Sequence, residues 1–210
     1  MSIIASRSSR RFAVVLGVTL GLVGSSSGVL AWQTGTIPGA VTPPAADCIV
    51  EPRTPDSLIA IFADATPVAD SAPETNATIP LGVTANEATS AEITATIHQA
   101  FACQNAGDFA RFFALLTDHA ILTIFPWIGP MLLDDESAAE MLAVVPPGDD
   151  FQQTILGIGA ISDVGDGRFT AVVVFADPNA SEPVSALHLT FFNIDGVWLI
   201  DGAIDFHTAE

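Results

Sequence analysis

The sequence contains no lysine, and its basic residues are six arginines and four histidines. Against them stand 24 aspartates and glutamates, which give a formal net charge of −18 at pH 7. Such an acidic surface repels phosphate backbones and anionic lipid headgroups. We therefore expect neither nucleic-acid binding nor peripheral membrane binding.

The chain also lacks long uninterrupted apolar runs, and its most apolar stretch lies at the N-terminus. Three arginines within residues 7–11 precede the apolar residues 12–23, a Gly/Ser stretch follows, and small residues lead to Ala31. This order is typical of a secretory signal peptide. We predict a signal peptide over 1–31 with cleavage near Ala31, which places the protein outside the cell or at the exterior of its envelope. The alternative is an uncleaved anchor over 12–32, just long enough to span a bilayer.

Cysteine is scarce, and both cysteines, Cys48 and Cys103, follow the predicted cleavage site. Two thiols in an exported chain usually form a disulfide. The bridge would join the N-terminal tail to the first long predicted helix. Two unrelated buried thiols are the alternative.

Motifs for metals and cofactors are missing as well. The acidic pairs lack the spacing of a calcium loop, the histidines lack zinc spacing, and no phosphate loop or dinucleotide fingerprint occurs. We predict no metal site and no cofactor.

The rest of the chain predicts a tail followed by one α+β domain. Residues 32–88 are rich in Pro, Thr and Ala and predict a flexible linker with one short helix at 57–62. Residues 89–210 form the predicted domain. Its helices begin at a capping box over 89–92, at Asp108, and at Asp134 or Asp135.

The second half of the domain predicts an antiparallel meander. A short strand at 119–125 comes first, and four more follow at 151–164, 168–176, 184–194 and 197–206. Gly157 and Gly159 predict a bend in the first of these four. Helices followed by a meander predict an α+β fold.

Asp195-Gly196 is a strong signal for a two-residue hairpin. The register that follows pairs Phe191 with Ile200 and Leu187 with Ile204 on an apolar face. On the other face it sets Thr190 opposite Asp201 and His188 opposite Ala203. We expect that second face to be solvated or to bind a partner.

Three segments resemble the nuclear-transport-factor-2-like superfamily, which includes SnoaL-like cyclases and ketosteroid isomerases. Residues 101–109, Phe-Ala-Cys-Gln-Asn-Ala-Gly-Asp-Phe, resemble the family's entry from its first to its second helix. Residues 117–120, Thr-Asp-His-Ala, resemble the step into its first strand, and residues 195–200, Asp-Gly-Val-Trp-Leu-Ile, its last strand. The resemblance implies a cone-shaped bent sheet wrapped around three helices, with a pocket at the open end.

The same resemblance argues against the family's usual chemistry. Its isomerases stabilise an enolate oxygen with a tyrosine and a protonated acid, and this chain contains no tyrosine. A catalytic role is therefore disfavoured. The remaining acid–base candidates are His119 and Asp118, although neighbours on a strand point to opposite faces.

The candidate pocket residues are four aromatic side chains: Phe101, Phe112, Trp127 and Trp198. Each has a plainer role as part of the core. We expect an exported module that binds a small hydrophobic ligand or another protein, with a homodimer through the outer sheet face. An acid–base enzyme and a dimerisation module without a ligand are the alternatives.

Overall fold

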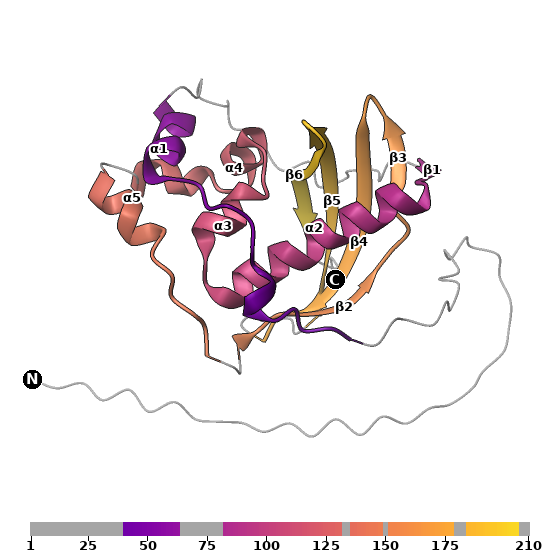
Figure 1. The fold of residues 1–210 in the computed structure, drawn as a ribbon, viewed down its shortest axis with the longest axis horizontal. Coiled ribbons are helices and arrows are strands. Elements are labelled where there is room, and N and C mark those ends of the chain that lie inside the picture. The colour runs from indigo at the N-terminus through magenta and orange to yellow at the C-terminus, as the bar shows by residue number, and fades with distance from the viewer. Residues whose placement is uncertain (1–39, 64–81, 132–134, 149–150, 179–183, 206–210) are drawn as a thin grey trace, which may run out of the picture. The chain divides into compact units, whose positions relative to one another are not determined.

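The computed structural model describes residues 40–63, 82–131, 135–148, 151–178 and 184–205, and these lie in one compact unit, Thr36–Glu210 (Figure 1). The predicted signal peptide at 1–31 falls outside the described residues. The fold is α+β, as predicted: a six-stranded antiparallel sheet that is not closed, with several helices. The long helix α2 crosses one face of the sheet.

The sheet runs in the order β1-β3-β4-β5-β6, and β2 pairs with β4 beside β3. Its strands are β1 Val83–Thr84, β2 Thr154–Ile158, β3 Ser162–Gly165, β4 Arg168–Ala176, β5 Val184–Ile194 and β6 Val197–Asp205. All pairings are antiparallel.

The single strand predicted at 151–164 is wrong in one respect, because it forms two strands. β2 pairs with the second half of β4 and β3 with the first half. The pairing of β2 shifts register between Ile155 and Gly157. Gly159 N still donates to Val172 O of β4 at 2.7 Å, and the chain leaves the ladder at Ala160. The glycines therefore mark a bulge and a break, which change the direction of the strand.

The predicted Asp195-Gly196 turn closes the last hairpin, and Asp166-Gly167 closes the hairpin between β3 and β4 in the same way. The residues Asp195 and Gly196 have φ values of 53° and 85°, and Asp166 and Gly167 have 54° and 74°. Positive φ at both central residues matches the right-handed twist of the flanking strands. Glycine adopts this region without a Cβ clash, and Asp is one of the few other residues that tolerates it.

The predicted register of the last hairpin is confirmed from Ile194 and Val197 to Phe191 and Ile200. Beyond that point it is wrong by one residue, because a bulge follows Phe191. Thr190 lies opposite Gly202, His188 opposite Ile204, and Leu187 opposite Asp205. The Asp201 side chain instead accepts a hydrogen bond from Thr117 Oγ1 at 2.7 Å, a tertiary contact that accompanies the extra residue.

The five α-helices of the described residues are α1 Pro55–Ala63, α2 Glu87–Ala106, α3 Phe109–Ala114, α4 Asp118–Ile124 and α5 Asp135–Met141, with 3₁₀ turns η1 Ala45–Asp47 and η2 Pro126–Met131. The predicted capping box at 89–92 is wrong, because Asn86 caps α2 by accepting from Thr89 N at 2.9 Å. Gly107 ends α2 with φ 64°, and a Cβ there would lie 2.0 Å from Val145 O. Asp108 then caps α3, as predicted.

The strand predicted at 119–125 is helix α4. The run at 120–124, Ala-Ile-Leu-Thr-Ile, is short and rich in β-branched residues. Its pattern therefore does not distinguish a strand from a buried helix. The Thr117 hydroxyl decides the outcome by accepting from Ala120 N at 3.1 Å, which caps the helix. Just before it, Leu116 forms an isolated parallel bridge with Ile200 of β6.

Part of the predicted linker packs on the domain, and we call residues 40–54 the strap. Val41 forms an antiparallel bridge with Ile155, and Cys48 forms the predicted disulfide with Cys103 of α2. Arg53 then donates from Nε to Phe113 O at 2.9 Å and from Nη2 to Leu116 O at 2.8 Å. The helix that follows buries Leu58 completely in the core.

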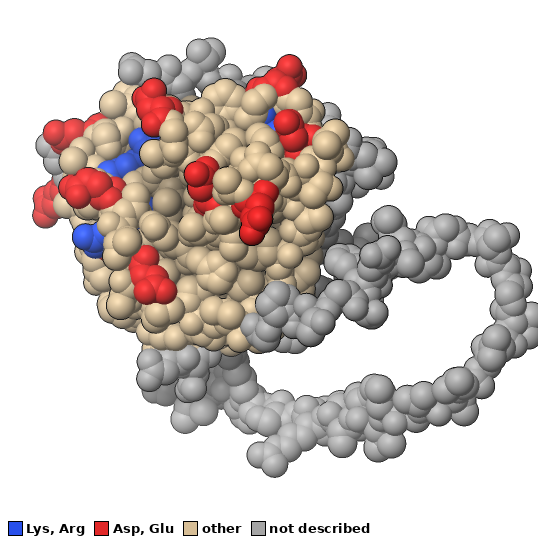
Figure 2. Space-filling model, turned by 45° about the vertical axis from the view of Figure 1, so that its right-hand side comes forward, with Lys and Arg blue, Asp and Glu red and all other residues tan. Residues whose placement is uncertain are grey.

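The core lies between α2 and the sheet face that carries Leu189, Phe191 and Val173. The opposite face, expected to be solvated or to bind a partner, is solvated only in part. On it, His188 is only 3% exposed and Thr170 only 5%. The acidic side chains are scattered over the protein surface (Figure 2).

Candidate functional site

The predicted acid–base residues lie on the first turn of α4 and are both exposed. Asp118 Oδ1 forms an ion pair with Arg53 Nη2 at 2.9 Å, and the His119 carbonyl accepts a hydrogen bond from Thr123. Neither residue lines either of the two cavities described below.

The two tryptophans also lie outside both cavities. Trp127, on η2, is 58% exposed and contacts the ring of Phe125. Trp198 packs edge-on against Phe169, and its Nε1 donates to Glu92 Oε2 at 2.9 Å. Trp198 therefore fastens β6 to the first half of α2.

The other two predicted aromatics come together in a cavity between α2 and the inner face of the sheet, which we call the inner pocket. Its volume is about 240 Å³. Aliphatic and aromatic side chains form nearly all of its wall, joined by two glutamines: Ile97, Ala100, Phe101, Gln104, Phe112, Leu116, Ile124, Phe125, Gln153, Phe175, Leu187, Leu189, Ile200 and Ala203. The described residues of this wall include no ionisable side chain.

Gln153, in the wall of the inner pocket, carries an oriented hydrogen-bond acceptor. Gln153 Nε2 donates to Asp177 Oδ2 at 3.0 Å, and a carboxylate can only accept, so this contact fixes which end of the amide is nitrogen. The remaining atom, Gln153 Oε1, is buried and has no hydrogen-bond partner. A buried unpaired acceptor is costly and favours a ligand that donates to it.

Asn105, at the end of α2, holds the backbone of Gln153 in place. Its Oδ1 accepts from Gln153 N at 2.7 Å, and its Nδ2 donates to Gln153 O at 3.0 Å. The same nitrogen also donates to Pro43 O of the strap at 3.0 Å. Asn105 is almost fully buried, so the acceptor has a fixed anchor.

Sequence reasoning missed both glutamines of the inner pocket. Gln104 could have been predicted, since it follows Phe101 by three positions on the same face of the helix. Gln153 gave no signal, because it precedes β2 and reaches the pocket only through its pairing with Asn105.

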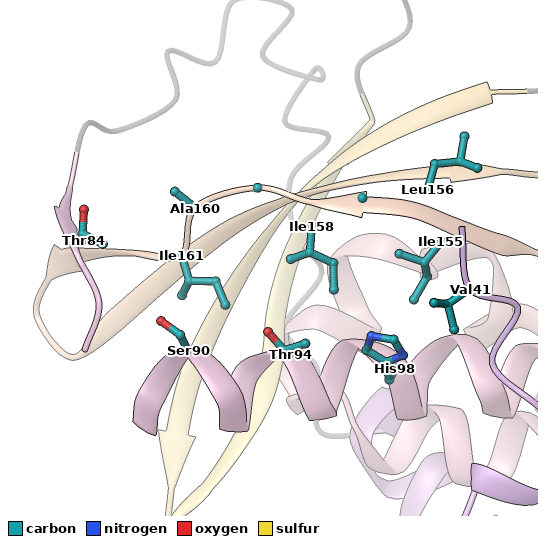
Figure 3. A pocket seen from close by; sticks show the side chains of 12 residues that line it. Val41, Thr84, Ser90, Thr94, His98, Ile155, Leu156, Ile158, Ala160 and Ile161 are labelled. Carbon is teal, nitrogen blue, oxygen red and sulfur yellow. The ribbon is translucent and has the colours of Figure 1, made fainter. Parts of the chain in front are cut away.

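A second and larger cavity, which we call the edge groove, runs between α2 and the β2–β3 connection (Figure 3). Its volume is about 480 Å³. The side chains of Ser90, Thr94 and His98 point from α2 toward Ile158, Ile161 and Ile155 on the other wall. Thr84, Val41, Leu156, Gly157, Gly159 and Ala160 complete the lining.

His188 is the one described residue whose environment clearly shifts its titration. Burial between strands lowers the pKa of its imidazole below the usual 6.5, because desolvation penalises the charged form. Val172 of β4 and Ile204 of β6 lie opposite it in the ladder. His188 lines neither of the two cavities.

Within the described ranges, no three His, Cys, Asp or Glu residues are grouped so that they could hold a metal ion. No described helix has the length and hydropathy needed to cross a membrane. Comparisons of the chain with protein-family models, with curated proteins and with solved structures found no match.

Proposed function

We propose that this domain binds a small, mostly apolar ligand carrying one hydrogen-bond donor, and that the inner pocket is its site. The single observation that carries the proposal is an apolar cavity whose wall includes Gln153, a residue with a fixed, buried and unpaired acceptor, Oε1. Ligand sites are typically apolar cavities with a few placed polar groups. At about 30 Å³ for each water-sized group, the volume of about 240 Å³ holds about eight such groups, which suits a small aromatic compound.

We further propose that the domain is an exported member of the nuclear-transport-factor-2-like superfamily, with a SnoaL-like fold. The disulfide supports export, because such bonds persist in oxidising compartments. The bulged β2, the long helix across the sheet and the inner pocket between this helix and β4, β5 and β6 support a cone-like arrangement.

The test compares 2-naphthol with 2-methoxynaphthalene, which has the same rings but no donor. We expect 2-naphthol to bind about tenfold more tightly by calorimetry, which corresponds to about 1.4 kcal/mol. Gln153→Leu should remove this preference and leave the binding of 2-methoxynaphthalene little changed.

A matched pair of variants tests the location. Ala100→Leu places a larger side chain in the inner pocket and should weaken both ligands at least about tenfold. Ala95→Leu makes the same change on the exposed side of α2 and should have no effect. Equal binding to both variants, or a naphthol preference that survives Gln153→Leu, would contradict the proposal.

A homodimer is the second candidate. Three large apolar side chains, Phe192, Ile194 and Val197, are 37%, 42% and 55% exposed near the β5–β6 turn. They share the outer sheet face and could form an isologous contact. A dimer in sedimentation, together with no binding of either naphthalene, would favour this candidate. The acid–base alternative gains no support from His119, which is exposed on α4.

A further inference from the structure

The edge groove follows a gap in the edge of the sheet. At one end Val41 pairs with Ile155 through two reciprocal bonds of 2.8 Å. At the other end β1 pairs with Ser162 and Asp163, and Ala85 N donates to Ile161 O at 2.9 Å. Among the described strands, β4 is the only one that pairs with β2, so residues 156–160 have no strand partner on their other side.

This open stretch lacks the usual protection of a sheet edge. Natural edges carry charged residues or proline to prevent pairing with another chain. Residues 155–161 read Ile-Leu-Gly-Ile-Gly-Ala-Ile, with no charge and no proline. Two glycines and an alanine leave the backbone accessible, and Gly159 and Ala160 are exposed.

The facing wall of the edge groove is polar. Ser90, Thr94 and His98 recur every fourth residue on α2 and point into the groove. A rise of about 1.5 Å per residue makes this row about 12 Å long. No described hydrogen bond involves these three side chains. The groove therefore lies beside an unpaired strand edge, and its wall on α2 is a row of donors and acceptors that faces the side chains of β2.

We propose that the edge groove binds an extended peptide segment of a partner protein, which adds a strand beside β2. Four residues at about 3.3 Å each match the 12 Å row. One edge of the peptide backbone would pair with residues 156–160, and the side chains on one face of the peptide would point toward α2, as those of Ile155 and Ile158 do. Strand addition of this kind draws its affinity from main-chain hydrogen bonds.

The lining also defines the peptide. It contains no Asp, Glu, Lys or Arg, so a charged side chain inside the groove would be desolvated without a partner. Small or β-branched uncharged residues are expected. The described end of the strap does not compete, because Ala40 is exposed and belongs to no strand.

The test uses the full chain and the peptide acetyl-Thr-Val-Thr-Val-amide, followed by amide chemical shifts in NMR. We expect saturable shifts at Gly157–Ala160 and at Ser90, Thr94 and His98. N-methylation of both threonines, or of both valines, removes the donors of one backbone edge. Because one backbone edge pairs with β2, one of the two changes should weaken binding at least about tenfold, and the other should have a much smaller effect.

Two variants locate the site. Thr94→Arg places a long charged side chain in the groove and should abolish the shifts, whereas Ala95→Arg on the exposed side of α2 should preserve them. Absence of shifts at about 5 mM peptide, or binding indifferent to N-methylation, would overturn the proposal. Slow exchange of the Ile158 amide without peptide would also overturn it, since the chain itself would then pair with this edge.

Discussion

The strap and the β5–β6 hairpin are held to the same core by different means. The hairpin is joined to its neighbours by continuous ladders, with β5 paired to β4 over nine residue pairs and to β6 over eight. The strap has the Val41 bridge, the Cys48 disulfide, the Pro43 contact with Asn105 and the Arg53 bonds. Removing one contact should therefore weaken the attachment of the strap more than a similar change weakens that of the hairpin.

The difference also explains why sequence patterns predict the hairpin better than the strap. A ladder is set by alternation and turn residues, which are local and repeated. The strap is rich in proline and has no period, so its attachment depends on particular long-range partners. Its position is consequently sensitive to single residues.

Loss of the disulfide should give the largest effect. Cys48→Ser with Cys103→Ser removes a cross-link across 55 residues, for which loop entropy gives about 4 kcal/mol in the free energy of unfolding. Urea denaturation of the oxidised parent and the variant measures the loss. A loss below about 1 kcal/mol would mean that the strap does not depend on the cross-link.

Arg53→Met should give the next largest effect. The guanidinium donates to the two backbone carbonyls Phe113 O and Leu116 O and pairs with Asp118. Charge-assisted bonds of this kind contribute about 1.5–3 kcal/mol, whereas the pair with exposed Asp118 adds little. We expect a loss of about 2 kcal/mol.

Arg168→Met is the matched control, because Arg168 is exposed at the start of β4. It should change stability by less than about 0.5 kcal/mol. Equal losses in the two variants would show that Arg53 acts through overall charge rather than through its contacts with α3.

Gly196→Ala tests the hairpin and should give the smallest effect. Its φ of 85° costs an L-residue about 1 kcal/mol, while the ladder beyond the turn keeps its pairs. Gly148→Ala is the control, since no positive φ occurs there and a Cβ would lie 3.5 Å from Phe151. A loss above about 3 kcal/mol for Gly196→Ala would mean that the turn, and not the ladder, holds the hairpin.

Much of the sheet followed from the sequence. Asp195-Gly196 predicted the turn and four correct pairs, because a two-residue loop fixes the register next to it. The register failed beyond Phe191, where the bulge coincides with the bond between Thr117 and Asp201. A bond between residues 84 positions apart cannot be read from local alternation.

The candidate sites were harder to predict from the sequence than the fold. Phe101 and Phe112 were expected in a pocket and line one, whereas Trp127 and Trp198 lie elsewhere. Helical periodicity places a side chain on a face but does not say which buried faces leave a space. The edge groove was missed because it arises where β2 breaks from β3, and the sequence predicted one continuous strand there.

Helix α2 borders both cavities, and this has a thermodynamic consequence. Ile97, Ala100, Phe101 and Gln104 form part of one cavity wall, while Ser90, Thr94 and His98 line the other. If a ligand in one cavity displaced α2, the shape of the other cavity would change. Two occupants that favour the same helix position would then strengthen each other's affinity by an identical factor, and opposed preferences would weaken both by an identical factor.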